Sequence, residues 1–160
     1  MKISVIIPCF NEEKTILKIL EKVNLQKTHL QLEIIISDDG SNDETITLLK
    51  ENSNLYDSLI ESKINRGKGA ALKKGIEIAS GELILFQDAD LEYDPNDYKK
   101  LIEPFLAHGA DVVYGSRFQG SAAHRLIYFS HRVANFILTI LVNLLTNINF
   151  SDVETGYKVF

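Results

Sequence analysis

The stretch Leu83-Ile84-Leu85-Phe86-Gln87-Asp88-Ala89-Asp90-Leu91-Glu92 joins an apolar run to two carboxylates separated by one residue. The apolar part has the composition of a buried strand, and residues i and i+2 of an extended chain point to the same side. Asp88 and Asp90 therefore converge beyond the tip of the strand if the strand persists to its end. Converging carboxylates repel each other unless a cation lies between them, and hard oxygen ligands favour Mg²⁺ or Mn²⁺. The alternative is a solvated strand end with two surface aspartates.

Strand-like and helix-like patterns alternate on both sides of this stretch. Strands are predicted over 3–8, 32–37, 59–61, 83–87 and 111–115, and helices over 12–25, 43–51, 68–79, 95–108 and 133–150. This alternation predicts an α/β fold with a mostly parallel sheet covered by helices on both faces. Such sheets bind ligands beyond the carboxyl ends of their strands, and every motif below lies at such an end. Pro104 is expected to kink or shorten the helix that contains it.

The composition is that of a single soluble globular domain. Hydrophobic residues make up 45% of the 160 residues, and a formal net charge of −5 argues against a general nucleic-acid-binding protein. The lone Cys9 fits a reducing compartment, and Met1-Lys2 leads directly into a strand rather than a signal peptide. No apolar stretch reaches the roughly 18–20 residues of a spanning helix. Because the chain ends on Lys158-Val159-Phe160 without a turn, we expect one domain over 1–160 that is truncated at its C-terminus.

The ends of the first two predicted strands carry acidic residues with two possible roles each. In Pro8-Cys9-Phe10-Asn11-Glu12-Glu13, Asn11 caps the next helix and the acids complement its dipole, or Glu12 accepts hydrogen bonds from a base or ribose. Ser37-Asp38-Asp39-Gly40-Ser41-Asn42-Asp43 contains turn and capping residues. Because its adjacent acids are in line with Asp88 and Asp90, one aspartate is also a candidate reader of a base N–H.

The segment Asn65-Arg66-Gly67-Lys68-Gly69-Ala70-Ala71 opens the predicted helix 68–79. Its glycines permit close backbone approach, and the start of a helix directs N–H groups at an anion. Arg66 and Lys68 add positive charge. The segment is neither a P-loop nor a complete Gly-x-Gly-x-x-Gly motif, because Leu72 stands at the third glycine position. An ordinary glycine-rich helix start is the alternative.

The last third of the chain is basic and apolar. No acidic residue stands between Asp111 and Asp152, whereas this region contains Arg117, His124, Arg125, His131 and Arg132. Within 133–150, a narrow polar stripe on an otherwise apolar helix is formed by Asn135, Thr139, Asn143 and Thr146. The helix either buries its broad apolar face in the core or lies in a membrane interface with the cations near lipid phosphates. The cations also favour an anion site.

Taken in order, these motifs resemble inverting family-2 glycosyltransferases with the GT-A fold. The matching elements are the Pro-x-aromatic-Asn-Glu-Glu opening at 8–13, Asp-Asp-Gly-Ser at 38–41, Asn-x-Gly-Lys-Gly-Ala at 65–70 and the Asp-x-Asp metal motif at 88–90. More narrowly, the chain is similar to dolichyl-phosphate mannosyltransferases and bacterial polyprenyl-phosphate glycosyltransferases. Their later signatures match Gly115-Ser116-Arg117 and Glu154-Thr155-Gly156-Tyr157-Lys158. From the sequence alone, Gly156 is equally typical of a turn.

The resemblance implies a role for each matching residue. The nucleotide sugar would be bound by Pro8, Glu12, Asp39, Lys68, Asp88, Ala89 and Asp90. The metal, Mg²⁺ or Mn²⁺, would be bound by Asp88, Asp90 and Glu92, although the family often has glutamine at the last position. The acceptor phosphate would be bound by Arg117, Arg125, His131 and Arg132. The catalytic residues would be Asp90, Arg117 and Glu154.

The implied reaction transfers a hexosyl group from UDP-glucose or GDP-mannose to a polyprenyl or dolichyl phosphate, by an enzyme peripheral to the cytoplasmic face of a membrane. An ionised phosphate acceptor needs charge neutralisation more than a base, which fits the acid-free last third. One alternative is a family-2 enzyme acting on a sugar or protein hydroxyl, which requires a carboxylate base. Another is a non-catalytic nucleotide-sugar-binding module. A nucleotidyltransferase would need a glycine-rich basic loop where Asn11-Glu12-Glu13 stand.

Overall fold

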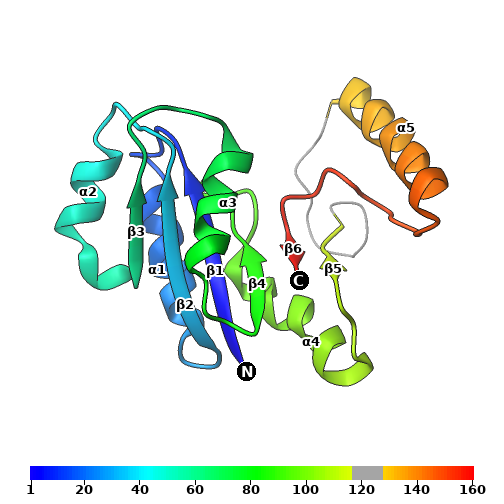
Figure 1. Cartoon of the computed structure of the whole chain (residues 1–160), viewed down its shortest axis with the longest axis horizontal. Helices are drawn as coiled ribbons and strands as arrows, with labels where there is room; N and C mark the ends of the chain where they lie inside the picture. The colour runs from blue at the N-terminus through cyan, green and yellow to red at the C-terminus, as the bar shows by residue number, and fades with distance from the viewer. Residues whose placement is uncertain (117–127) are drawn as a thin grey trace.

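The computed structural model describes residues 1–116 and 128–160, built around a six-stranded sheet in the order β3-β2-β1-β4-β6-β5 (Figure 1). The strands are β1 (Lys2–Cys9), β2 (Gln31–Asp38), β3 (Ser58–Glu61), β4 (Leu83–Phe86), β5 (Val113–Tyr114) and β6 (Lys158–Val159). The first four strands are parallel, and β6 runs antiparallel to both β4 and β5. The predicted mostly parallel sheet is therefore confirmed.

Helices cover both faces of this sheet. The covering helices are α1 (Ile16–Gln26), α2 (Thr45–Glu51), α3 (Lys68–Ile78) and α4 (Tyr98–His108), with short 3₁₀ turns at Ser53–Leu55 and Pro95–Asp97, whereas α5 (Phe129–Thr146) lies apart from the sheet (Figure 1). On one face, buried residues of α1, α2 and α4 pack with Val5 and Ile7 of β1 in the main hydrophobic core. On the other face α3 lies against β1, and a Cβ at Gly75 would come within 2.4 Å of Ile6. Glycine at this position allows the close approach of helix and strand.

The first helix starts later than predicted. α1 begins at Ile16, because the preceding residues are tied to the loop after β2. The N–H of Asn11 donates to Ser41 Oγ at 2.9 Å, and the N–H of Glu12 donates to Thr45 Oγ1 at 2.8 Å. The prediction that the helix starts at residue 12 with Asn11 as its cap is therefore wrong, since Asn11 joins two loops instead.

The second half of the sheet also differs from the prediction. Pro104 lies inside α4 without shortening it, since the helix continues to His108 and ends at Gly109, whose φ is +61°. β5 covers only two residues of the predicted 111–115 strand. The antiparallel β6 was not predicted, because a two-residue strand carries no periodic signal.

The polar stripe of α5 faces the protein. Asn135 donates through Nδ2 to Asp152 Oδ1 at 2.9 Å, and Thr139 Oγ1 accepts from the N–H of Val153 at 3.3 Å. Asn143 exchanges two hydrogen bonds of 2.9 Å with the backbone of Phe150. These contacts fasten residues 150–153, which lead from α5 back toward β6, to the polar face of the helix.

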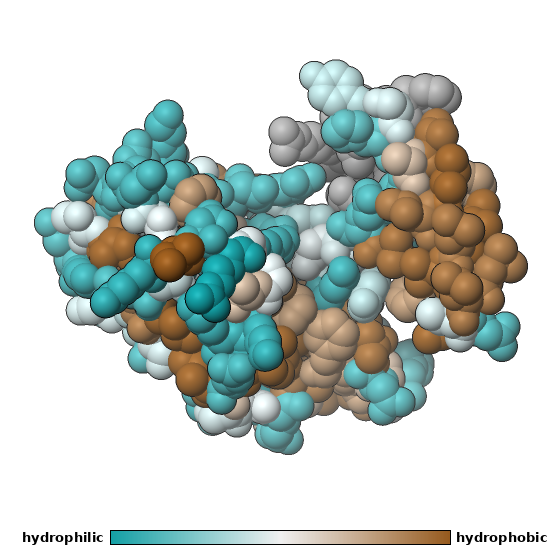
Figure 2. Space-filling model, turned by 45° about the horizontal axis from the view of Figure 1, so that its top comes forward, coloured by the Kyte–Doolittle hydropathy of each residue, from teal (hydrophilic) through white to brown (hydrophobic). Residues whose placement is uncertain are grey.

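The apolar face of α5 points outward (Figure 2). Leu144 and Leu145 are 77% and 85% exposed. The same exposed surface includes Val133, Phe136, Ile137, Leu138, Ile140 and Leu141. The interpretation that this face is buried in the core is therefore wrong for the described residues. In the ranges that the structure covers, no helix is both long and apolar enough to cross a bilayer.

Candidate functional site

A cavity of about 280 Å³ lies where the carboxyl ends of β1, β2 and β4 meet the first turn of α3. The lining includes every residue assigned above to the nucleotide sugar, namely Pro8, Glu12, Asp39, Lys68, Asp88, Ala89 and Asp90. The other lining residues are Cys9, Phe10, Asn65, Gly67 and Ala71. Parallel strands end at one edge of the sheet, so motifs far apart in the sequence share this cavity.

Asp38 and Asp39, adjacent at the end of β2, have different structural tasks. Asp38 is buried and accepts a hydrogen bond from the N–H of Gly40 at 2.9 Å, so it stabilises its own turn. Oδ2 of Asp39 reaches instead to the loop before α3 and accepts from the N–H groups of Arg66 at 2.9 Å and Gly67 at 2.6 Å. Asp39 therefore fixes the glycine-rich loop against the cavity, and turn chemistry accounts only for Asp38.

Lys68 is the first residue of α3 and forms an ion pair with Asp88 across the cavity. It follows Gly67, whose φ of +90° favours glycine. Its Nζ contacts Oδ1 of Asp88, and the lysine side chain is 52% exposed whereas that of Asp88 is mostly buried. Because the ammonium is the more exposed partner, it can turn toward an anion in the cavity without disturbing buried contacts.

The structure does not bring the three predicted metal ligands together. Leu91 has a φ of +65°, a left-handed conformation that turns the chain sharply after Asp90. Glu92 is exposed and absent from the cavity lining, and its N–H donates to Asp90 Oδ1 at 3.0 Å. Within the described ranges, no group of three His, Cys, Asp or Glu side chains is arranged to hold a metal ion.

The residues present nevertheless fit a hard cation. Asp88 and Asp90 both line the cavity and both offer carboxylate oxygens. Mg²⁺ characteristically binds one or two carboxylates and completes its octahedral shell with water and substrate phosphate. Two carboxylates beside a cavity that has room for a phosphate therefore satisfy the requirement, without a third protein ligand.

A buried hydrogen-bond network around Gln87 supports the Asp88 loop. Gln87 donates through Nε2 to the carbonyl of Asp88 at 2.9 Å, and its Oε1 accepts from the hydroxyls of Tyr98 at 2.9 Å and Tyr157 at 3.0 Å. Burial raises the pKa of both tyrosines, so both hydroxyls stay protonated and donate. The network links β4 to α4 and to the segment before β6.

The segment before β6 lies directly against Asp88. A Cβ at Gly156 would lie 2.5 Å from Asp88 Oδ2 and 2.6 Å from the Tyr93 ring. The N–H of Gly156 donates to the Tyr93 hydroxyl oxygen at 2.7 Å, which fixes this approach. Gly156 is therefore required by close packing against the Asp-x-Asp motif, beyond any role as a turn residue.

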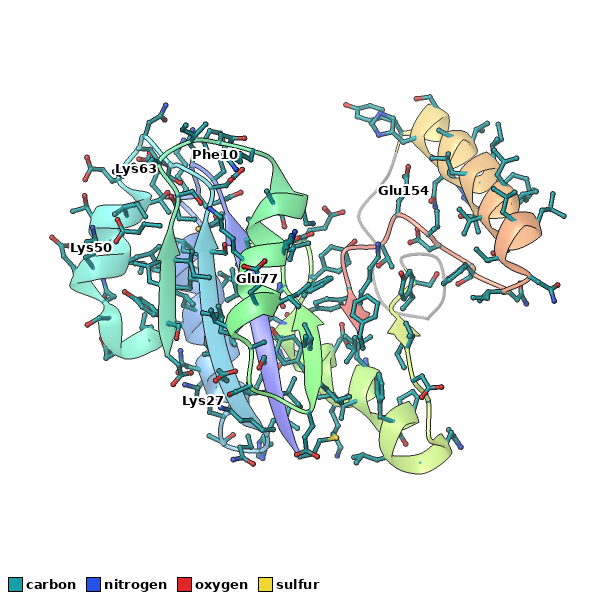
Figure 3. All side chains as sticks on the ribbon, viewed as in Figure 1. Phe10, Lys27, Lys50, Lys63, Glu77 and Glu154 are labelled. Atoms are coloured by element: carbon teal, nitrogen blue, oxygen red, sulfur yellow. The ribbon has the colours of Figure 1, made fainter. Side chains whose placement is uncertain are left out.

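The predicted acceptor-side and catalytic residues that the structure describes, namely His131, Arg132 and Glu154, are not part of the cavity lining. Glu154 is exposed on the segment between α5 and β6, whereas Phe10 lies beyond the carboxyl end of β1 (Figure 3). His131 and Arg132 are exposed in the first turn of α5. Arg117 and Arg125, together with His124, fall outside the described residues.

Two contributors to the site were missed by the sequence analysis. Phe10 is 41% exposed and lines the cavity. An aromatic residue placed directly after a strand end, beside polar neighbours, is the signal that identifies it. Gln87 is fully buried, and its signal is a polar side chain at the end of an otherwise apolar strand.

Known proteins resemble this chain in sequence and structure. A UDP-N-acetylglucosamine–dolichyl-phosphate N-acetylglucosaminyltransferase of Methanococcus voltae is 31% identical over 99% of this chain and 68% of its own. A dolichol-phosphate mannosyltransferase of Pyrococcus furiosus is 34% identical over 74% of this chain and 34% of its own. Glucosyl-3-phosphoglycerate synthase of Mycobacterium tuberculosis, solved with Mn²⁺, UDP and phosphoglyceric acid, has a TM-score of 0.73 at 24% identity.

The match to this solved structure covers 99% of this chain and 55% of the solved chain. This chain therefore spans about one third to about two thirds of the length of each of these three proteins. The structural likeness confirms the predicted GT-A fold. The family described as glycosyl transferase family 2 matches residues 4–160, nearly the whole sequence. The chain belongs to glycosyl transferase family 2.

Proposed function

We propose that this chain is an inverting glycosyltransferase that moves a hexosyl group from a nucleotide sugar to a polyprenyl or dolichyl phosphate. The observation that carries the proposal is the cavity at the sheet edge, which gathers Asp39, Lys68, Asp88 and Asp90. The names of the two curated relatives support an acceptor of this class. UDP-glucose and GDP-mannose are the candidate donors, and residues 1–160 form one glycosyltransferase domain.

The donor is proposed to lie along the cavity from β2 to β4. Pro8, Glu12 and Asp39 lie at the end that would receive the nucleoside, and the exposed ring of Phe10 offers a surface for stacking on a base. Lys68 lies where the diphosphate would pass Asp88, and its ammonium would contact phosphate oxygens.

Asp88 and Asp90 would hold Mg²⁺ or Mn²⁺, with Glu92 as a further candidate ligand outside the cavity lining. When bound, the cation would neutralise negative charge that builds on the leaving diphosphate. Lys68 would add to this stabilisation from the first turn of α3, where backbone N–H groups also favour an anion.

The acceptor phosphate oxygen would attack the anomeric carbon as the bond from that carbon to the diphosphate breaks. The diphosphate would leave with the electron pair, and attack from the opposite side inverts the configuration. A phosphate monoester has a second pKa of about 6, so it is largely ionised at neutral pH and needs no general base. The proposed acceptor-binding residues are Arg117, Arg125, His131 and Arg132. Asp90, Arg117 and Glu154 are the proposed catalytic residues.

We infer that α5 places the protein on the cytoplasmic face of a membrane. Its polar stripe is used internally, and its exposed face is apolar over the whole helix (Figure 2). His131 and Arg132 add exposed basic side chains at its first turn. An apolar helix face with cations at its border suits the interface of an anionic bilayer, where the acceptor's lipid chain resides.

Transfer assays with purified chain test this proposal. Radiolabelled UDP-glucose and GDP-mannose are each offered to farnesyl phosphate or to free sugars, with Mn²⁺, Mg²⁺ or a chelator. We expect metal-dependent transfer from one donor to farnesyl phosphate, which retains the phosphate but needs no membrane. Transfer only to sugars would favour the alternative hydroxyl acceptor. Calorimetric binding of UDP or GDP without any turnover would favour a non-catalytic binding module.

A further inference from the structure

β6 carries a lysine next to the Asp-x-Asp motif. Lys158 pairs with Tyr114 of β5, while the neighbouring Val159 pairs with β4. Tyr157 and Val159 are buried, whereas Gly156 and Lys158 are half-buried, as expected for alternating sides of an extended segment. Lys158 thus follows by two residues the glycine that meets Asp88.

The two oxygens of Asp88 face different elements. Oδ1 is paired with Lys68 of α3, and Oδ2 is the atom that a Cβ at Gly156 would approach to 2.5 Å. Lys68 lines the donor cavity, whereas Lys158 does not. The two lysines thus come from different elements, Lys68 from α3 and Lys158 from β6, and Lys158 stands outside the donor cavity.

The ammonium of Lys158 has no direct carboxylate partner among the described ion pairs. Its Nζ lies over the ring of Tyr114, 5.0 Å from the ring centroid. Burial lowers the pKa of Lys158, as does repulsion from Lys68, whereas Asp152 and Asp88 act in the opposite direction. A partly desolvated ammonium that is repelled by a second lysine gains from binding an anion.

We propose that Lys158 binds the phosphate group of the acceptor, near Asp88 and outside the donor cavity. The proposal rests on the proposed lipid-phosphate transfer. Asp88 and the donor diphosphate are both negative, so an incoming phosphate dianion is repelled unless a cation lies between them. Lys158 supplies that cation, while Tyr114 holds its side chain in place through the ring face.

Calorimetric titration separates the acceptor side from the donor side. Farnesyl phosphate, farnesol and UDP with Mn²⁺ are each titrated into wild type, Lys158→Met and Lys158→Arg. We expect Lys158→Met to weaken farnesyl phosphate binding about tenfold or more, since a charge-assisted hydrogen bond is lost. Binding of farnesol and of UDP with Mn²⁺ stays unchanged, and Lys158→Arg retains most of the affinity. Lys100→Met, at an exposed lysine of α4 paired with Asp97, is the matched control.

Weaker binding of UDP with Mn²⁺ by Lys158→Met would overturn the proposal, because it assigns the ammonium to the donor. Unchanged binding of every probe would overturn it as well. If Lys158→Met does not fold, Lys158→Gln replaces it with a polar side chain of similar length. If the wild type transfers sugar to no lipid phosphate, the proposed function fails, and titration with inorganic phosphate still compares the anion affinity of wild type and variant.

Discussion

Gly156 lies so close to Asp88 that a Cβ on the glycine would come within 2.5 Å of the carboxylate Oδ2. The contact joins the segment before β6 to the loop after β4, two parts of the chain separated by the whole of α4 and α5. The position of Asp88 therefore depends on a segment near residue 156, far along the chain from Asp88 itself. Substitutions at Gly156 act on the proposed metal site without altering a carboxylate.

Gly156→Ala is expected to push the Asp88 loop and the segment before β6 apart. Overpacking of this kind typically costs about 1–3 kcal/mol of stability. Metal-dependent UDP binding should weaken in parallel, measured by calorimetry, and urea unfolding gives the stability change. Gly69→Ala is the control for the stability measurement alone, because a Cβ there meets nothing within 4 Å. Because Gly69 lies in α3, its replacement by alanine should leave the free energy of unfolding unchanged or raise it by up to about 1 kcal/mol. Normal nucleotide binding by a folded Gly156→Ala protein would contradict the proposed dependence.

Asp90→Ala and Glu92→Gln are expected to differ sharply in transferase activity. Asp90 lines the cavity and Glu92 does not. Loss of a carboxylate that would hold the metal should lower kcat/KM roughly 100-fold or more, and Asp90→Ala should abolish measurable transfer. Glu92→Gln should retain activity within about threefold of wild type by the same measure. The opposite order of effects in steady-state assays would assign the cation to Glu92.

Gln87→Leu is expected to destabilise the fold and disorder the Asp88 loop. The substitution leaves the hydroxyls of Tyr98 and Tyr157 buried without their acceptor, at about 1–3 kcal/mol for each hydroxyl. In a background of Tyr98→Phe and Tyr157→Phe, the same substitution should cost much less, since no donor is then stranded. Urea unfolding of the four proteins completes the cycle, and strictly additive effects would show that the network is not coupled.

Acid should destabilise the protein partly through Glu33, at the other end of the sheet. Although burial opposes ionisation, hydrogen bonds from Lys2, Ser4 and Ser80 hold the pKa of Glu33 at about 2, below the ordinary 4.5. A carboxylate whose pKa is lower in the folded state contributes stability above its unfolded-state pKa and loses it as the pH falls. The free energy of unfolding should therefore decrease from about pH 4.5 toward 2. Urea titrations should give Glu33→Gln a shallower slope in this interval, and equal slopes would exclude the contribution.

The exposed face of α5 is expected to mediate membrane binding. The wild type should float with vesicles of anionic lipid, whereas the double substitution Leu144→Glu and Leu145→Glu should abolish flotation, because it places charge on two highly exposed leucines of the apolar face. Leu25→Glu combined with Leu106→Glu is the matched control, since both leucines are exposed elsewhere, at 66% and 71%. Equal flotation of both double variants would contradict a role for α5.

The sequence predicted the edge of the sheet at which the motifs meet, because alternating strands and helices fix the direction of parallel strands. The same rule predicts that Asp39, Lys68 and Asp88 lie at one edge, and all three line one cavity. The late start of α1 could not be predicted from the sequence, because it depends on hydrogen bonds between Asn11 and the loop that follows β2. Local hydrophobic and capping patterns do not identify hydrogen-bond partners that are distant in the sequence.

The orientation of α5 could not be predicted from the sequence either. Hydrophobic periodicity identified the polar stripe through Asn135 and Thr139, but it does not determine whether the polar or the apolar face packs against the protein. The answer came from the returning segment, where Asp152 and Val153 supply partners for that stripe. Gln87 illustrates the same point, because its role depends on Tyr98 and Tyr157, which reach it only in the folded chain.

The position of β6 between β4 and β5 sets an order of assembly. β1 to β4 pair with one another directly, so the donor half of the sheet can form as soon as β4 has left the ribosome. In the described part of the sheet β5 pairs with β6, so its partner, residues 158–159, is synthesised only after the whole of α5. The strands that carry Pro8 and Asp39 can thus pair before the segment that fixes the Asp88 loop has been synthesised, so the nucleotide cavity is completed only when residues 156–159 arrive.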